Sequence, residues 1–467
     1  MRKGKRVSHL INNIEVIDII SEGRSVLKKE DIVIFAENGV PGDFVDVEVF
    51  KKRSSYWEGR IICINKESAK RIKPFCEHFY QCGGCKWQFL KYEDQLFYKE
   101  KQVKDAFRKI GKIEAPDVIG IIGNKADKYY RNKLEFTFSN KGWLDKETFS
   151  TGIPFKEALG FHVRGMFNKI VDLKECYLQA EPSNSLRNAI KEYSLSKKYD
   201  FFDIEKQDGF LRNLLVRTTQ TGETMLILSF FYEDISKIND LLNHVSTKFP
   251  ELSSIVYFIN DKKNDTLTGL NPVLFKGNPY ITDTISGNKY RISPISFFQT
   301  NTLQAENLYN IVKSYLDGVG EEVVYDLYTG TGTIANHVAN QVKKVVGIEY
   351  IEEAISDAKV NSEINNISNT VFYAGDMVKV LNDELIAKEG KPDVIITDPP
   401  RVGMHEDVVN KIIELLPKKV IYVSCNPATQ ARDVLLMKEF YNVDKIQPVD
   451  MFPHTHHVEN VVLLNRK

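Results

Sequence analysis

One thiol and one carboxylate stand where an exposed edge of a sheet is expected. Cys425 directly follows the apolar run IYV, and Glu459 directly precedes the apolar run VVLL. A thiolate that adds to carbon 6 of a pyrimidine makes carbon 5 nucleophilic enough to accept a methyl group. A base must then remove the proton from carbon 5 before the thiol can leave. Glu459 is the first candidate for this base, and His457 is a second one.

A glycine-rich turn lies about a hundred residues before Cys425. The segment VVYDLYTGTGT predicts a strand, a turn and the start of a helix, with Gly330 and Gly332 in the turn. Such a turn lets a ligand approach the backbone and the free N–H groups of the helix. With Ala335 it also fits the dinucleotide pattern G-x-G-x-x-A, in which Glu349 would hold a ribose. The turn alone does not separate NAD from S-adenosylmethionine.

Carboxylates at four successive strand ends favour S-adenosylmethionine. Asp326, Glu349, Asp376 and Asp398 each close an apolar run of the C-terminal third. Parallel strands bring these ends to one edge of a sheet, where ligands bind in doubly wound folds. Asp326 can meet the cationic methionine end there. A single aspartate at such a position is more typical of a helix N-cap, but four carboxylates at successive strand ends are not explained in that way.

Two other interpretations of these residues stay open. Asp398 begins the segment Asp-Pro-Pro-Arg, which also suits a methyltransferase that acts on an exocyclic amine. That chemistry needs no nucleophilic thiol, and Cys425 would then be a small core residue. The histidines of HTHH at residues 454–457 are weak support for a metal site, because they follow one another on a loop.

Four other cysteines form a candidate metal set. Cys76, Cys82 and Cys85 lie within ten residues in the pattern C-x5-C-G-G-C, and Cys176 is a plausible fourth ligand. A ligand set of thiolates alone suits zinc or an iron–sulfur cluster. Zinc sites usually pair two close C-x2–4-C units, and only one is present, so an iron–sulfur cluster is favoured. Cys63 lies in a predicted strand and is expected to be a core residue.

The composition is that of a globular protein of several domains. The chain has 467 residues, is 42% hydrophobic and carries no net charge. It has no run of about 18 apolar residues and no apolar signal segment, so neither a membrane span nor secretion is expected. Six cysteines predict a reducing cytoplasm rather than a disulfide framework. Basic residues outnumber acidic ones in residues 1–112, a weak sign of a nucleic-acid partner. No obligate protein partner is evident.

The predicted elements give a multidomain α/β protein with three parts. Residues 1–67 read as short strands separated by turns and predict a small barrel of the OB type. Residues 68–292 predict a central α+β domain that holds the cysteine set, with a helix from about Tyr92 to Ile110. Residues 293–467 alternate strands and helices and predict a doubly wound, mostly parallel, Rossmann-like domain.

Five motifs together resemble the RNA uracil-5 methyltransferase family, the RumA/TrmA group: FFQTN, DLYTGTGT, DPPR, SCNPATQARD and MFPHTHHVE. The resemblance implies that Cys425 is the nucleophile and Glu459 the general base. This chain has Thr329 where the family often has Cys or Ser. The change should not disturb the turn, because the turn binds its ligand through the backbone. Thr333 stands where some members have Asn, and it is not taken as a ligand. The resemblance further implies contacts to S-adenosylmethionine from Gln299, which would also reach the uracil, and from Tyr328, Glu349, Asp376 and Asp398.

The N-terminal part resembles the TRAM module of the 23S rRNA branch. In that branch the C-x5-C-G-G-C pattern with a later cysteine holds a [4Fe-4S] cluster, which implies Cys76, Cys82, Cys85 and Cys176 as ligands. The expected activity is therefore S-adenosylmethionine-dependent carbon-5 methylation of a uridine in 23S rRNA. The same chemistry on tRNA is the first alternative, and an RNA-binding assembly factor with a vestigial site is a less favoured one.

Contacts to RNA are expected from basic and aromatic side chains. The uridine must leave its stack before a thiol can attack it. Phosphate contacts and stacking surfaces would hold the surrounding RNA. The candidates are Lys51, Lys52, Arg53, Lys70, Arg71, Lys73 and the segment Tyr129 to Lys133, which resembles the family's Y-R-N-K element at the substrate face.

Overall fold

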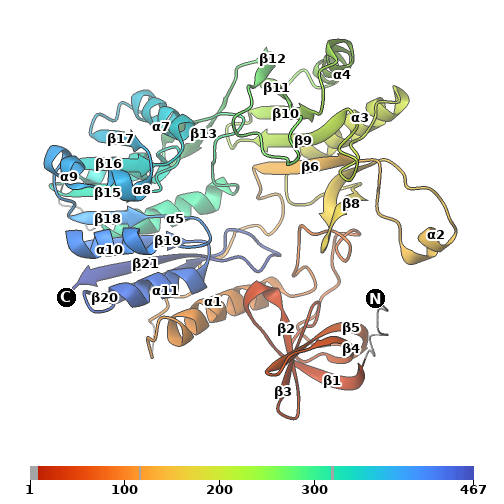
Figure 1. The fold of residues 1–467 in the computed structure, drawn as a ribbon, viewed down its shortest axis with the longest axis horizontal. Coiled ribbons are helices and arrows are strands. Elements are labelled where there is room, and N and C mark those ends of the chain that lie inside the picture. Colours follow the sequence, from red (N-terminus) through yellow and green to blue (C-terminus); the bar gives the residue numbers. More distant parts are fainter. Residues whose placement is uncertain (1–8, 115–116, 317–319) are drawn as a thin grey trace, which may run out of the picture.

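The computed structural model describes residues 9–114, 117–316 and 320–467. Within these ranges the chain forms an N-terminal barrel, a central sheet and a C-terminal sheet (Figure 1). None of the described helices is both long and apolar enough to cross a bilayer. The division of the chain at residues 67 and 292 stays a prediction.

The barrel is closed by five strands in the order β1-β2-β3-β5-β4. Its core consists of alternating side chains such as Val16, Leu27 and Val45, so the small barrel expected from the short strands is present. Cys63 is exposed, and its assignment to the core was wrong. An irregular register between β4 and β5 skips Ile62, so Ile61 faces the core and Cys63 faces outward. The bounds are β1 His9–Ile19, β2 Ser25–Lys29, β3 Ile32–Ala36, β4 Phe44–Lys52 and β5 Tyr56–Lys66, with a short turn of helix at Ser21–Gly23.

The central sheet has seven strands in the order β12-β11-β10-β9-β6-β7-β8. Helices α3 (Ser183–Ser196) and α4 (Ile235–Lys248) contribute buried side chains to the same core as the cysteine-rich segment. A short helix, α2, spans Lys146–Ser150. The strands are β6 Lys133–Ser139, β7 Ala158–Val163, β8 Met166–Asp172, β9 Leu211–Thr218, β10 Thr224–Phe230, β11 Ser254–Ile259 and β12 Val273–Gly277.

The C-terminal sheet has the order β17-β16-β15-β18-β19-β21-β20. Strands β15 to β19 are parallel, and β21 and β20 are antiparallel to their neighbours, which confirms a doubly wound, mostly parallel sheet. A hairpin of β13 (Ile281–Ile285) and β14 (Asn288–Ile292) precedes it. The strands are β15 Val323–Leu327, β16 Lys344–Glu349, β17 Thr370–Ala374, β18 Val394–Thr397, β19 Lys419–Ser424, β20 Tyr441–Val449 and β21 Glu459–Arg466.

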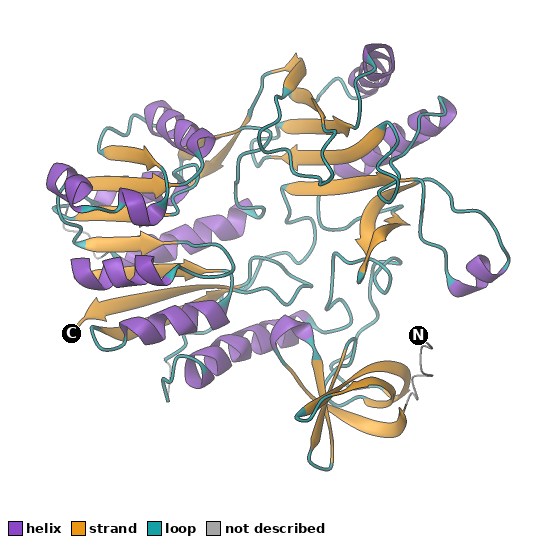
Figure 2. Ribbon diagram, viewed as in Figure 1, coloured by secondary structure: helices purple, strands orange, loops and turns teal. Residues whose placement is uncertain are grey.

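Helices cover both faces of this sheet (Figure 2). One core joins the sheet to α5, α6 and α7, and a second core joins its other face to α1 and to α8 through α11. Helix α1, expected in the central domain, thus packs on the C-terminal sheet through Val103 and Phe107. The bounds are α1 Tyr92–Lys109, α5 Thr302–Tyr315, α6 Thr333–Val338, α7 Glu352–Ile364, α8 Met377–Val380, α9 Asp383–Glu389, α10 Glu406–Leu415 and α11 Pro427–Met437, with a 3-10 turn at Ala339–Gln341.

Candidate active site

The predicted nucleophile and the predicted base meet at the C-terminal edge, meaning the edge where strands β15 to β19 end. Cys425 follows β19, and Glu459 begins the antiparallel strand β21 beside it. The register pairs Ser424 with Asn460, so the next residues outward, Cys425 and Glu459, lie opposite each other. Asp398 directly follows the neighbouring strand β18. The sheet therefore gathers a thiol and two carboxylates that are far apart in sequence.

Cys425 is held between a strand end and a helix start. The next residue, Asn426, is the N-cap of α11 and accepts a hydrogen bond from the Ala428 amide at 3.1 Å, and Pro427 occupies the first turn. The partial positive charge at a helix N-terminus favours an anion there. The N-terminus of α11 therefore favours the thiolate form of Cys425, whereas burial favours the thiol.

Arg401, the fourth residue of DPPR, is a functional candidate that the motif alone does not single out. Its backbone carbonyl accepts hydrogen bonds from the Asn426 side chain at 3.0 Å and from the Thr429 hydroxyl at 3.2 Å. These contacts fix the DPPR segment against the segment that carries Cys425. The guanidinium lies 3.0 Å from Nδ1 of His457. The arginine at the fourth position of DPPR is the sequence feature that could have indicated this role.

Burial sets the ionisation of the three reactive groups. Burial and nearby Asp398 together raise the pKa of Glu459 to about 8, and Arg401 opposes them. Burial also raises the pKa of Asp398 to about 7, with Asp326 acting in the same direction. Burial, Glu459 and Asp398 together raise the pKa of Cys425 to about 11, and the charge and hydrogen bonding of Arg401 oppose them. Glu459 is thus a much stronger base than an ordinary carboxylate.

The glycine-rich turn follows β15 beside these groups. Tyr328 has a positive φ of 63°, uncommon for a residue with a side chain, and Gly330 and Gly332 also have positive φ. The amide of Gly330 donates to the Glu349 carboxylate at 3.1 Å. Asp326 is 1% exposed, and its Oδ1 has no hydrogen-bond partner among the described residues. An unpaired buried carboxylate oxygen beside such a turn suits a cationic ligand.

Asp376 caps the N-terminus of a helix, the role that is typical of a single aspartate after a strand. Its Oδ1 accepts hydrogen bonds from the amides of Val378 and Lys379 at 3.1 and 3.2 Å, and the residue is the N-cap of α8. It is exposed beyond the end of β17, two strands from β15. A contact to the adenine remains a prediction for this residue.

Gln299 lies in the loop between β14 and α5, which packs on the glycine-rich turn. The Thr331 hydroxyl donates to the Phe297 carbonyl at 3.4 Å. The side chain of Asn132 donates to the Gln299 carbonyl at 2.8 Å, and buried Arg217 donates to the Ser296 carbonyl at 2.7 Å. Asn132 and Arg217 position this loop from the central sheet, a role that the sequence reasoning did not assign.

Comparison with known proteins agrees with this geometry. Residues 278–467 match the family model described as tRNA (Uracil-5-)-methyltransferase. An uncharacterized RNA methyltransferase from Bacteroides thetaiotaomicron is 49% identical over 449 residues, which cover 95% of this chain and 99% of the relative. A second one, from Porphyromonas gingivalis, is 48% identical over 464 residues, which cover 97% of this chain and 99% of the relative.

This chain belongs to the RNA uracil-5 methyltransferase family. It is similar in structure to the Pyrococcus abyssi tRNA (uracil-54, C5)-methyltransferase in complex with S-adenosyl-L-homocysteine, with a TM-score of 0.76 and 29% identity. The similarity covers 97% of this chain and 99% of the archaeal one. The protein is therefore an S-adenosylmethionine-dependent RNA methyltransferase, as the five motifs implied.

The histidines of this methyltransferase pack within the protein. His454 is 2% exposed and lies 3.2 Å from an oxygen of Asp127. Burial lowers the pKa of His457 to about 2, with His456 and Arg401 acting in the same direction, so His457 is neutral. A ring that stays neutral beside Arg401 accepts a hydrogen bond from it. Of the two candidate bases, Glu459 therefore has the higher affinity for a proton.

The four predicted metal-binding cysteines gather around one cavity. Its lining includes Phe79, Phe161 and the thiols of Cys76, Cys82, Cys85 and Cys176. Yet among the described residues no group of three or more His, Cys, Asp or Glu side chains is arranged to hold a metal ion. The structure thus brings together residues 82 and 176, which are far apart in sequence, and the iron–sulfur cluster stays a prediction.

Several of the residues expected to contact RNA have other roles. Arg71 has a side chain only 5% exposed and forms an ion pair with buried Asp43 at 2.6 Å, so it fastens the barrel to the following segment. The Tyr130 hydroxyl donates to the Pro453 carbonyl at 3.0 Å. Burial lowers the pKa of Lys133 to about 8. Tyr129, by contrast, is 48% exposed and stays a candidate for stacking.

Proposed function

We propose that this enzyme methylates carbon 5 of a uridine through a covalent adduct on Cys425, with Glu459 as the general base. The observation that carries the proposal is the register of β19 and β21, which sets the thiol and the carboxylate opposite each other at the C-terminal edge. An amine methyltransferase needs neither group, whereas carbon-5 chemistry needs both.

The proposed reaction begins at Cys425. Its thiolate, favoured by Arg401 and the N-terminus of α11, forms a bond to carbon 6, and the ring becomes an enolate. S-adenosylmethionine supplies an electrophilic methyl group, whose carbon bonds to carbon 5 while the electron pair of the broken bond stays with the donor sulfur. Glu459 then accepts the proton from carbon 5. The electrons of that C–H bond re-form the ring double bond, and the carbon–sulfur bond breaks to release the thiolate.

The proposed donor site lies over the glycine-rich turn. Asp326, with its unpaired buried oxygen, would take the cationic methionine end, and Glu349 would take the ribose. Tyr328, Asp398 and Gln299 would complete the site beside Cys425, and Asp376 would lie near the adenine. The donor set fits the ligand, because Asp326, Glu349 and Asp398 lie at the ends of neighbouring strands, where their carboxylates favour a cation.

A mechanism-based trap tests the chemistry. Fluorine at carbon 5 cannot leave as a cation, so RNA containing 5-fluorouridine should hold the enzyme as a covalent adduct that mass spectrometry detects. The adduct should form with the parent protein and be absent with Cys425→Ala. Cys63→Ala is the matched control, because Cys63 is an exposed thiol on the barrel. Methyl transfer that survives Cys425→Ala would contradict the proposal and favour amine methylation.

The proposed RNA substrate is 23S rRNA. It rests on the resemblance of the barrel and the cysteine pattern to the 23S rRNA branch. A second candidate is tRNA, because the structurally similar archaeal protein is a tRNA (uracil-54, C5)-methyltransferase. Methylation of both unmodified RNAs with labelled donor, followed by mapping of the trapped fragment, separates the two. Product in tRNA alone would overturn the rRNA proposal and leave the chemistry intact.

The four cysteines are proposed to hold a [4Fe-4S] cluster. The cavity that they line is mostly apolar, with Gln88 and Glu175 also in its lining. The Gly84 amide donates to the sulfur of Cys82 at 3.3 Å, a contact typical of cluster-binding loops. Each thiolate that binds such a cluster is a ligand of a different iron. The four sulfur atoms can therefore lie farther from one another than the ligands of a single metal ion do. Nothing in the methyl transfer needs an electron, so the proposed role is structural.

Iron and sulfide content after purification without oxygen tests the cluster. The parent protein and Cys63→Ser should contain iron and acid-labile sulfide in equal amounts, and Cys176→Ser should lose both. Stoichiometric zinc without sulfide would contradict the proposal. The measurement does not depend on methylation activity.

A further inference from the structure

The proposed general base stands at the end of a hairpin loop. Residues 450–458 connect β20 to β21, and the register pairs Val449 with Glu459 at the base of the loop. Asp450 is therefore the first residue of the loop, and Glu459 is the first residue after it. The contacts that hold residues 450–458 therefore act on the segment that leads directly into Glu459.

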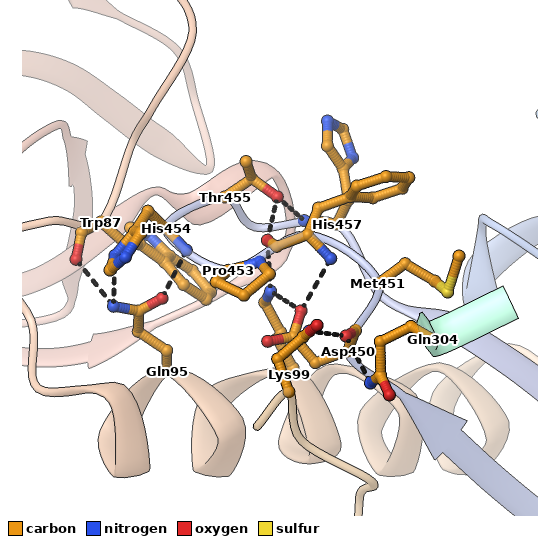
Figure 3. A network of polar contacts seen from close by, with 12 residues as sticks. Trp87, Gln95, Lys99, Gln304, Asp450, Met451, Pro453, His454, Thr455 and His457 are labelled. Carbon is orange, nitrogen blue, oxygen red and sulfur yellow. Dashed lines mark hydrogen bonds and ion pairs between the residues drawn. The ribbon is translucent and has the colours of Figure 1, made fainter. Parts of the chain in front are cut away.

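A buried ion pair holds the start of this loop (Figure 3). Lys99 on α1 donates to Oδ1 of Asp450 at 2.5 Å, and both side chains are 0% exposed. The Phe452 amide donates to the same oxygen at 3.0 Å, and Lys99 also donates to the Phe452 carbonyl at 2.9 Å. The Tyr92 hydroxyl, from the first turn of α1, donates to Oδ2 of Asp450 at 2.7 Å. The carboxylate is thus fully satisfied by α1 and by its own loop.

A second set of contacts holds the middle of the loop at His454, whose φ is +63°. Gln95, one turn before Lys99 on α1, accepts a hydrogen bond from the His454 amide at 2.8 Å, and its Nε2 lies 3.2 Å from Nδ1 of His454. The amides of Lys86 and Trp87 donate to the His454 carbonyl at 2.7 and 2.9 Å. His454 is therefore held both by helix α1 and by the segment that directly follows Cys85.

We propose that helix α1 sets the position of the general base, with Lys99 and Gln95 as positioning residues for Glu459. The proposal rests on the function proposed above for Glu459. A buried ion pair costs desolvation, and a packed apolar pair of similar volume often stabilises a fold as well. The ion pair instead fixes the conformation of the loop, because its directional hydrogen bonds allow one arrangement where apolar packing would allow several.

The double variant Lys99→Met with Asp450→Asn tests the proposal, because it removes both charges together and leaves neither buried alone. With ordinary uridine-containing RNA we expect methyl transfer in a single turnover to change little. Release of product from the adduct should slow by about 10- to 100-fold, because a small displacement of a catalytic group costs that much. The methylated adduct should therefore accumulate, as mass spectrometry can measure. The matched control is Glu100→Gln with Lys104→Met, which removes a more exposed ion pair from the same helix.

Glu459→Gln is the reference for the two possible failures. If Glu459→Gln accumulates the adduct and the double variant turns over like the parent, the positioning proposal is wrong and the proposed base stands. Equal slowing of every step in the double variant would also overturn the positioning proposal. If Glu459→Gln accumulates no adduct, the proposed function of Glu459 fails instead. Should the double variant not fold, Gln95→Met carries the same test through the contacts to His454.

Discussion

The guanidinium of Arg401 lies 3.0 Å from Nδ1 of His457, and the low pKa of that histidine keeps the ring neutral. The contact joins the segment after β18 to the loop before β21, past the end of β19, which Cys425 directly follows. It holds a permanent positive charge beside Cys425, where the charge opposes the rise in the thiol pKa that burial causes.

Arg401→Gln is expected to slow adduct formation. Arg401 lowers the pKa of Cys425, so its loss should reduce the thiolate fraction and move the pH profile of adduct formation to higher pH. The rate near neutral pH should fall by about 10- to 100-fold, as removal of one charged partner allows. Trapping rates with 5-fluorouridine RNA across pH measure both effects. Arg108→Gln, an exposed arginine on α1, is the control, and an unchanged profile in Arg401→Gln would exclude this role.

Glu459→Gln is expected to stop the reaction after methyl transfer. The amide cannot accept the proton from carbon 5, so the methylated adduct on Cys425 should accumulate with ordinary RNA. Turnover should fall by about 10²- to 10⁴-fold, the usual contribution of a general base. Gel shift under denaturing conditions detects the adduct. Glu363→Gln on the exposed side of α7 should behave like the parent. Turnover of Glu459→Gln at the parental rate would assign the base elsewhere.

The same variant is expected to be more stable than the parent at alkaline pH. The folded-state pKa of Glu459 is raised from 4.5 to about 8, so the folded protein keeps a proton that the unfolded chain loses. Parental stability from this group therefore falls as pH rises from about 4.5 to about 8, by an amount on the order of a few kcal/mol. Glu459→Gln removes this loss. Thermal unfolding at pH 5 and pH 8 should show a gain in Tm at the higher pH only.

Asp326→Asn is expected to weaken donor binding and to flatten its pH dependence. Burial raises the pKa of Asp326 to about 7, so its carboxylate becomes anionic as pH rises through neutrality. Affinity for S-adenosylhomocysteine, which keeps the cationic amine, should rise over this range in the parent. The variant should bind about tenfold more weakly, or about 1.4 kcal/mol, at high pH. Calorimetric titration measures this, with Asp444→Asn, an exposed residue, as the control. Parental affinity in Asp326→Asn would contradict the role.

Much of the fold was accessible from local patterns. Apolar runs closed by acidic residues located the parallel strands, and the observed α1, Tyr92–Lys109, differs from the expected helix by one residue. The packing of α1 could not be predicted from the sequence, because an amphipathic pattern shows that a helix has a buried face but does not show against which core that face packs. The register irregularity that turns Cys63 outward also depends on a partner strand.

The sequence by itself determined which reactive groups follow which strands, and hence that Asp326, Glu349, Asp398 and Cys425 approach one edge. That inference holds because parallel strands end together. Only the tertiary structure decided that β21 inserts antiparallel beside β19 and brings Glu459 opposite Cys425. It also decided the pKa values, since burial is a property of the packed chain. The buried pair of Lys99 and Asp450 spans the chain, and no local pattern predicts which distant charge will neutralise another.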